Sequence, residues 1–367
     1  MSRRRKYIDS DVLTEAKARI RHIFDVFDSV TVMFSGGKDS LVTLLLVKEV
    51  AEELGRLPVN AVFRDEELIP ESVIATVDHY RQEPWLNLLW FALPLHSSLF
   101  VLGDVRTYIQ WDPTREHVRA IPAWAITSVA EDREGTVYSQ YEMDQVVARF
   151  YRGKICAVTG IRASESLVRY RASVNKLNEN YITKSDSGLK GEKNAARLRA
   201  PNVMLGKPIY DWEEDDVLQY IWEHQLPYAG TYDNQHLAGV GLRVSTPLHA
   251  EASKHFGKLR ETEPELYAAC IAIWPDMLLQ ERYWSSLDRK ALLRRYGQSW
   301  AGVRAYITEH ITDETSQRLA FRRLDEVELM AMRRPESWPT EYILSAMVTG
   351  AFKRVIQPLK PKAEELA

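Results

Sequence analysis

The chain of 367 residues contains only two cysteines, Cys156 and Cys270. Two cysteines cannot supply the four thiolates of a cysteine-only zinc site or of a typical iron–sulfur cluster, so we expect no iron–sulfur cluster. Cys156 lies in the apolar run 154–158, and Cys270 lies in an alanine-rich helical run. We therefore interpret both as small core residues rather than as nucleophiles.

Long apolar runs and a strong net charge are also missing. Charged residues interrupt every apolar run before it reaches membrane-spanning length, and the basic residues 3–6 precede a charged stretch rather than the apolar part of a secretory signal. The formal net charge is −3, so no overall basic field indicates nucleic-acid binding. We expect a cytoplasmic protein that does not engage a membrane.

The most informative segment, residues 35–40, reads Ser-Gly-Gly-Lys-Asp-Ser and lies between the apolar runs 30–34 and 41–47. This pattern predicts a strand, a glycine loop and a helix. Backbone N–H groups of such a loop, together with the positive end of the helix, can bind a phosphate. The predicted nucleotide-binding residues of the loop are Ser35, Gly36, Gly37, Lys38, Asp39 and Ser40.

Strand-like and helix-like patterns alternate over the first half of the chain. We expect strands at 30–34, 58–63, 86–91 and 155–159, and helices at 10–27, 39–54, 70–82, 143–151 and 213–224. The first helix has Asp9 or Ser10 as its N-cap, and the last is capped by the pair Asp211-Trp212. Short connections favour right-handed crossovers, so the predicted fold class is α/β with a doubly wound, mostly parallel sheet.

Three further segments have other patterns. Residues 93–140 show weak periodicity and are interpreted as loops and short helices, and residues 178–207 are polar and basic and are interpreted as a loop. Beyond residue 245 the spacing of apolar residues is helical. We therefore expect a nucleotide-binding domain at 1–244 and an α-helical C-terminal domain at 245–367.

Ligands of parallel sheets bind at the carboxyl ends of the strands, and several candidates follow the predicted strands there. Phe63 could contact an adenine or belong to the core, and Asp65 could reach ribose, magnesium or water. Asp39 could bind Mg²⁺ or cap its own helix.

Gly160 and Arg162 follow the fourth strand. The remaining candidates are arginines that could bind phosphates or form surface ion pairs: Arg162 and Arg243 for ATP, and Arg169 and Arg171 for a second anion.

The segment 162–207 adds ten Lys and Arg residues against four acids. Such a segment is either a solvated loop face or an anion-binding flap that could lie over a nucleic-acid backbone.

The loop 35–40 differs from the Gly-x-x-x-x-Gly-Lys-Ser/Thr loop of kinases and GTPases and is similar to the PP-loop of ATP pyrophosphatases. Five further blocks follow in order: Arg-Asp-Glu-Glu at 64–67, Gly-Ile-Arg-Ala-Ser-Glu-Ser at 160–166, Lys-Pro-Ile-Tyr-Asp-Trp at 207–212, Leu-Pro-Tyr at 226–228 and Gly-Val-Gly-Leu-Arg at 239–243. Over residues 10–245 the chain thus resembles the phosphoadenosine-phosphosulfate reductase family. That family includes the small subunit of ATP sulfurylase and the ATP pyrophosphatases of DNA phosphorothioation systems.

The resemblance implies an adenine-nucleotide alpha-hydrolase-like fold that uses ATP and Mg²⁺, with catalytic roles for Lys38, Asp39, Arg162 and Arg243. Reductases of this family carry a cysteine in a C-terminal tail, whereas the tail 357–367 has none. Without that thiolate, reductase activity is not expected. The Dnd-type enzymes carry a cysteine cluster that this chain also lacks, and the chain is more similar in this respect to the Ssp type.

We therefore expect an ATP pyrophosphatase that transfers AMP to a DNA backbone phosphate before sulfur insertion. Its partners would be a cysteine desulfurase and other DNA-modification proteins, with DNA as the acceptor. Two alternatives remain open: a subunit similar to the small subunit of sulfate adenylyltransferase, and a nucleotide-sensing regulator that keeps the fold without efficient turnover.

Overall fold

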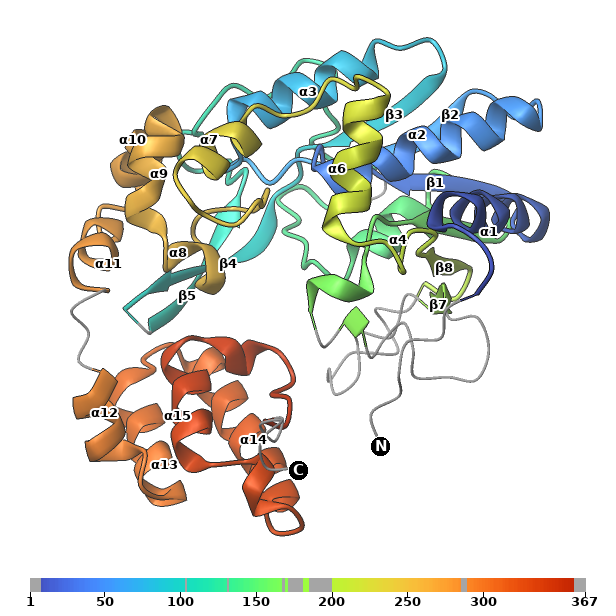
Figure 1. The fold of residues 1–367 in the computed structure, drawn as a ribbon. Coiled ribbons are helices and arrows are strands. Elements are labelled where there is room, and N and C mark those ends of the chain that lie inside the picture. Colours follow the sequence, from blue (N-terminus) through green and yellow to red (C-terminus); the bar gives the residue numbers. More distant parts are fainter. Residues whose placement is uncertain are drawn as a thin grey trace. The chain divides into compact units, whose positions relative to one another are not determined.

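The computed structural model describes residues 8–102, 104–130, 132–166, 169–170, 181–184, 200–284 and 289–359. The chain forms two compact units (Figure 1). The first contains residues 1–95, 111–236 and 240–244, and the second contains residues 96–110, 237–239 and 245–367. The expected boundary after residue 244 is also a boundary of these units, but the second unit takes in two earlier segments as well.

The first unit is built on a six-stranded sheet with the order β3-β2-β1-β6-β8-β7. All neighbours are parallel except β7, which runs antiparallel to β8. The strands are β1 (Ser29–Met33), β2 (Val59–Arg64), β3 (Leu86–Phe91), β6 (Ile155–Val158), β7 (Ile182–Lys184) and β8 (Val203–Gly206). The predicted α/β class with a mostly parallel sheet is confirmed.

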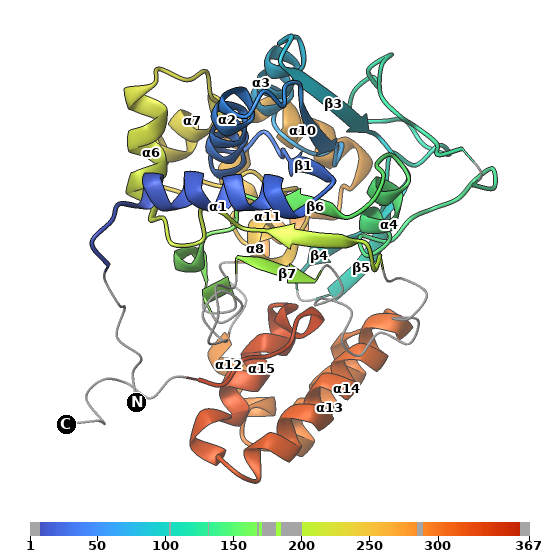
Figure 2. The same cartoon turned by 90° about the vertical axis from the view of Figure 1, so that its right-hand side faces the viewer.

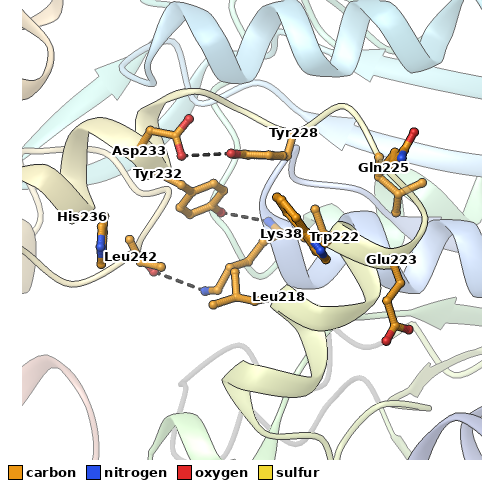
Figure 3. A pocket seen from close by; sticks show the side chains of 12 residues that line it. Lys38, Leu218, Trp222, Glu223, Gln225, Tyr228, Tyr232, Asp233, His236 and Leu242 are labelled. Carbon is orange, nitrogen blue, oxygen red and sulfur yellow. Dashed lines mark hydrogen bonds between the residues drawn. The ribbon is translucent and has the colours of Figure 1, made fainter.

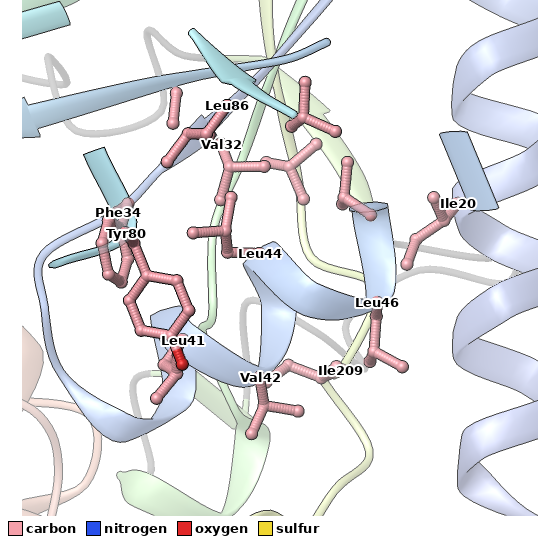
Figure 4. Close-up of a cluster of buried hydrophobic side chains, with 14 of the residues drawn as sticks. Ile20, Val32, Phe34, Leu41, Val42, Leu44, Leu46, Tyr80, Leu86 and Ile209 are labelled. Carbon is pink, nitrogen blue, oxygen red and sulfur yellow. The ribbon is translucent and has the colours of Figure 1, made fainter. Parts of the chain in front are cut away.

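Helices cover both faces of this sheet (Figure 2). They are α1 (Val12–Val26), α2 (Lys38–Glu53), α3 (Glu71–Arg81), α4 (Met143–Ala148), α6 (Glu214–Glu223) and α7 (Thr231–Leu237), with a 3₁₀ turn, η1 (Ala163–Glu165). Side chains of α1, α2, α3 and α6 share one core cluster with Ala61 and Phe63 of β2 (Figure 4). Val62, which points to the opposite side of β2, packs with α4 in a second cluster.

Two expected helix caps are wrong. The N-cap of α1 is Asp11, whose side chain accepts a hydrogen bond from the N–H of Thr14. The N-cap of α6 is Glu213, which forms a capping box with Asp216. Asp211 accepts two hydrogen bonds of 2.8 Å from Arg19 instead.

Two segments that were expected to be irregular contain strands. Residues 93–140 include β4 (Leu95–Val101) and β5 (Asp104–Gln110), which pair with each other. Residues 178–207 include β7 and β8, while 185–199 lie outside the described residues. β7 and β8 have only three and four residues, and the apolar residues of β4 and β5 do not alternate strictly with polar ones.

The second unit combines the β4–β5 pair with helices, so its helical part was predicted and its hairpin was not. The helices are α8 (Ala250–Ser253), α9 (Phe256–Thr262), α10 (Pro264–Ile273), α11 (Met277–Tyr283), α12 (Arg289–Tyr296), α13 (Trp300–His310), α14 (Glu314–Ala331) and α15 (Thr340–Val348), with 3₁₀ turns η3 (Pro335–Ser337) and η4 (Ala351–Lys353). Phe100 and Val105 of the hairpin belong to the same apolar core as α13, α14 and α15. Among the described residues, no helix combines the length and the apolar character needed to cross a bilayer.

Candidate functional site

The predicted phosphate loop connects β1 to α2, at the carboxyl end of the central strand. Gly36 has a φ of +74°, and a Cβ at this position would lie 2.7 Å from methyl carbons of both Val73 and Val77 of α3. Positive φ and lack of space both require glycine here. The loop therefore passes tightly over α3.

Several N–H groups of the loop are bonded to hydroxyl groups of the protein. Ser40 Oγ accepts from the N–H of Ser35 at 3.1 Å, and Tyr232 Oη accepts from the N–H of Lys38 at 2.9 Å. The N–H groups of Gly36 and Asp39 have no acceptor among the residues that the structure describes. A phosphate oxygen could accept hydrogen bonds from these two N–H groups directly. It could also replace the Tyr232 hydroxyl as the acceptor of the Lys38 N–H.

Gly160, just after β6, lies against the first turn of α2. A Cβ at Gly160 would be 2.6 Å from the carbonyl carbon and oxygen of Asp39 and 2.8 Å from the nitrogen of Ser40. Only glycine allows two backbone segments to approach this closely. This contact brings the residues after β6, including Arg162, to the phosphate loop, as the sequence predicted.

Charged side chains form a compact cluster at the start of α2. Arg162 Nε lies 2.5 Å from Asp39 Oδ1, and Lys38 Nζ lies 3.4 Å from Asp39 Oδ2. Lys38 Nζ also lies 3.0 Å from Glu214 Oε1 of α6. The side chains of Lys38 and Arg162 are each only 5% exposed. Two nearly buried cations thus face two carboxylates at the loop, so an incoming phosphate would compete with those carboxylates for them.

A cavity of about 910 Å³ opens beside Lys38, entirely within the first unit (Figure 3). Its walls come from α6, α7, the loop between them and Leu242, whose carbonyl oxygen lies 3.4 Å from Lys38 Nζ. Tyr232 lines the cavity and contacts the phosphate loop at the same time. Burial raises the pKa of Tyr232 well above its usual value, so its hydroxyl stays protonated near neutral pH.

Two predicted residues at the end of β2, Phe63 within the strand and Asp65 just after it, are held in the protein interior. The ring of Phe63 packs edge-to-face against Trp90 with a centroid distance of 4.6 Å, so only the Phe63 backbone remains for an adenine. The carboxylate of Asp65 is buried and accepts hydrogen bonds from Trp90 Nε1, from the Glu67 N–H and from Arg119. A ribose or magnesium role for Asp65 would require these bonds to break.

Two of the remaining predicted arginines, Arg243 and Arg169, have partners other than Lys38. The N–H and carbonyl of Arg243 bond to the side chain of Gln235, and the residue is exposed. Arg169 forms an ion pair with Glu165 one turn away. Arg171 lies outside the described residues.

Sequence reasoning missed three side chains near this edge of the sheet. Tyr232 and Glu214 contact Lys38 from sequence distances of 194 and 176 residues. Lys207 follows β8 directly, is buried, and has a pKa lowered by that burial. Its place in the block at 207–212, after a strand, was a signal that could have drawn attention to it.

The fit of a magnesium ion rests on Asp39. Among the described residues, no group of three or more His, Cys, Asp or Glu side chains is placed to hold a metal. Mg²⁺ that arrives with a nucleotide usually needs only one or two protein carboxylates besides the phosphates. Asp39 is suited to that role, although both of its oxygens lie near cations here.

Neither cysteine is placed for chemistry. Cys156 and Cys270 are both buried, and burial raises the pKa of Cys156 to about 12. A thiol with this pKa is not ionised at neutral pH and is a poor nucleophile. The interpretation of Cys156 as a core residue is confirmed.

The family model of the phosphoadenosine phosphosulfate reductase domain matches residues 136–262. The chain is 27% identical over 277 residues to "Uncharacterized protein YbdN" of Escherichia coli strain K12, and the match covers 71% of this chain and 65% of that protein. The chain thus spans somewhat less than two thirds of the length of this relative.

Three solved structures are similar at low identity. The FMN adenylyltransferase of Candida glabrata in complex with ATP is 13% identical with a TM-score of 0.38, and the match covers 65% of each chain. The phosphoadenylyl-sulfate reductase of Candida auris in a phosphate complex is 14% identical with a TM-score of 0.33, and the match covers 60% of this chain and 84% of that one. The U34-tRNA thiolase NcsA of Methanococcus maripaludis with its [4Fe-4S] cluster is 16% identical with a TM-score of 0.33, and the match covers 74% of this chain and 79% of that one.

Proposed function

We propose that this chain, a phosphoadenosine phosphosulfate reductase-like protein of the ATP pyrophosphatase and adenylyltransferase superfamily, binds ATP on the loop 35–40 and cleaves it between the α and β phosphates. The observation that carries the proposal is the pair of nearly buried cations, Lys38 and Arg162, gathered at the glycine loop. Buried cations need accompanying anions, and here these are the partly exposed carboxylates of Asp39 and Glu214. A triphosphate is the anion that such a loop suits, and it could take the place of Glu214 at Lys38.

In the proposed reaction an oxygen of an acceptor attacks the α phosphorus. A new P–O bond forms, the bond to the bridging oxygen breaks, and its electron pair leaves with pyrophosphate. No atom is oxidised or reduced. Lys38 and Arg162 would stabilise the charge that develops on pyrophosphate, and a water-poor site makes that stabilisation stronger. A magnesium ion held by Asp39 would neutralise further phosphate charge.

The finer part of the proposal concerns the acceptor, which we take to be a DNA backbone phosphate prepared for sulfur insertion. Both cysteines are buried, so sulfur would have to come from a separate cysteine desulfurase. Arg169 and Arg171 are the residues proposed to contact the acceptor, and Arg243 is proposed to reach the ATP phosphates. With sulfate as the acceptor, the same chemistry would release pyrophosphate and form adenylyl sulfate.

The test is pyrophosphate release from ATP by the full chain, alone and with duplex DNA, single-stranded DNA or sulfate. Lys38→Ala and Asp39→Ala are expected to lower the rate at least 100-fold, because they remove a charge from the reacting phosphates. Lys48→Ala is the matched control, since Lys48 lies on the same helix and forms its ion pair with Glu52 at the surface. ATP binding is measured in parallel by thermal shift.

Wild-type protein that binds no ATP, or Lys38→Ala protein that binds and cleaves ATP normally, would overturn the proposal. Sulfate-dependent turnover without any effect of DNA would retain the enzyme and reject the DNA acceptor. ATP binding without turnover under every condition would favour the nucleotide-sensing regulator.

A further inference from the structure

We propose that the cavity beside Lys38 is the acceptor subsite, and that it takes a nucleobase whose attached phosphate points toward the phosphate loop. This inference rests on the proposed function, because it assigns the acceptor of the same reaction. The ligand is either a free mononucleotide or a single strand of nucleic acid. Both offer the cavity the same groups, a flat aromatic base joined to a phosphate.

The walls of the cavity suit a flat ring. Trp222 of α6, Tyr228 of the following loop, and Tyr232 and His236 of α7 supply rings, while Leu218 and Leu242 supply aliphatic surface (Figure 3). Bases of any sequence stack on such side chains, because every base has a π face. The volume of about 910 Å³ lies within the range of nucleotide-sized and drug-sized pockets.

Trp222 supports a ligand-binding role in particular. It is 83% exposed, although tryptophan usually buries most of its large apolar surface. An exposed tryptophan on the wall of a cavity gives a ligand a stacking partner that requires no rearrangement of the core.

The charge at the floor gives the ligand a direction. Lys38 lines the cavity and belongs to the phosphate loop, so it can attract a ligand phosphate to the end of the cavity beside that loop. Two acids, Glu223 and Asp233, also line the cavity, and Asp233 accepts a hydrogen bond of 2.9 Å from Tyr228 Oη. Figure 3 shows these two acids on different sides of the cavity, so a phosphate is attracted to Lys38 and repelled from both of them.

The same features argue against the other possible occupants. Sulfate is far smaller than the cavity and would leave the rings without a partner. No residue of β2 or β3 lines the cavity, whereas the adenine of ATP is expected beside β2. The base of the cavity's ligand is therefore a second base, distinct from that of ATP.

The test measures binding of a fluorescein-labelled single-stranded DNA octamer by anisotropy, with ATP binding followed separately by thermal shift. Trp222→Ala is expected to weaken octamer binding about 5-fold or more, with Trp222→Phe retaining most of the affinity. The affinity for ATP is expected to change less than twofold. Trp124→Ala is the matched control, because Trp124 is 48% exposed in the same unit but lies outside the cavity.

Competition by thymidine monophosphate distinguishes the two sources of the ligand. Displacement of the octamer at similar concentrations indicates a free mononucleotide, and much weaker displacement indicates a nucleic-acid strand; both support the proposal.

Three results would overturn the proposal: Trp222→Ala binding the octamer like wild type, Trp222→Ala losing ATP affinity in equal measure, or Trp124→Ala weakening octamer binding as much. If wild type binds the octamer through Trp222 but binds no ATP, the proposed function fails while the cavity remains a nucleotide site. If ATP binds and the octamer does not, only the cavity assignment fails.

Discussion

Gly160→Ala tests whether the end of β6 positions the phosphate loop. The added Cβ would lie 2.6 Å from the carbonyl carbon and oxygen of Asp39, both of which are backbone atoms. Ordinary contacts of a Cβ begin near 3.4 Å, so the two segments must separate by several tenths of an ångström. Overpacking of this kind costs about 1–3 kcal/mol of unfolding free energy.

The effect on activity should exceed the effect on stability. The shift displaces the first turn of α2, which carries Lys38 and Asp39, and misplacement of reacting groups by about 1 Å can lower a rate on the order of 100-fold. The assays are pyrophosphate release and thermal unfolding of the same preparation. Each kcal/mol lost should lower the Tm by about 2–4 °C for a unit of this size.

Gly230→Ala is the control. Gly230 precedes α7 in the same unit, and a Cβ there would meet no atom within 4 Å. Gly230→Ala should leave both pyrophosphate release and the Tm near the wild-type values. If Gly160→Ala also behaves like wild type, or if both variants lose activity equally, the close approach of β6 to α2 does not set the geometry of the loop.

Three further predictions concern other parts of the molecule. Glu67→Gln should lower the unfolding free energy by about 3 kcal/mol in chemical denaturation, because the fully buried carboxylate loses its charge and its ion pair with Arg115. Glu261→Gln at the exposed pair with Lys258 should cost less than about 1 kcal/mol. Burial lowers the pKa of Lys353 from 10.5 to about 8, so its charged form destabilises the fold below pH 8 and this penalty disappears as the pH rises toward 10.5. Lys353→Met should therefore raise the Tm at pH 7 and increase the free energy of unfolding by at most about 3 kcal/mol, and this gain should shrink above pH 8. A gain that does not depend on pH would contradict this reasoning. Finally, mass spectrometry after iodoacetamide at pH 8 should find no labelled cysteine in the folded chain and two in denaturant; rapid labelling of native Cys156 would show that its thiol is accessible.

The phosphate loop could be predicted because its signal is local. Glycines at 36 and 37 between two apolar runs fix a turn through backbone geometry alone, and the strand and helix around it follow from periodicity. The partners of Lys38 could not be predicted in this way. Tyr232 and Glu214 reach it through tertiary packing of α6 and α7 near α2, and no local pattern records that contact.

Competition between neighbouring residues explains the misplaced caps. Asp9, Ser10 and Asp11 are all good N-cap residues, and in the structure Asp11 takes this position, with its side chain accepting a hydrogen bond from the Thr14 N–H. Charge misled the interpretation of 178–207 in a similar way. The segment is basic enough to suggest a loop, yet β8 adds to the parallel sheet beside β6 because Val203 is buried there.

The charge balance at the loop explains how one lysine could serve both proposed ligands. Asp39 is fixed between Arg162 and Lys38, whereas Glu214 is 48% exposed and contacts only Lys38 in the cluster. Glu214 also lies in the first turn of α6, where the helix dipole stabilises a carboxylate without any cation. Its separation from Lys38 therefore costs little, and Lys38 can exchange a carboxylate for a phosphate. The pair of Lys38 with Glu214 holds the lysine side chain beside the cavity, and in the proposed function an anion would replace the acid there.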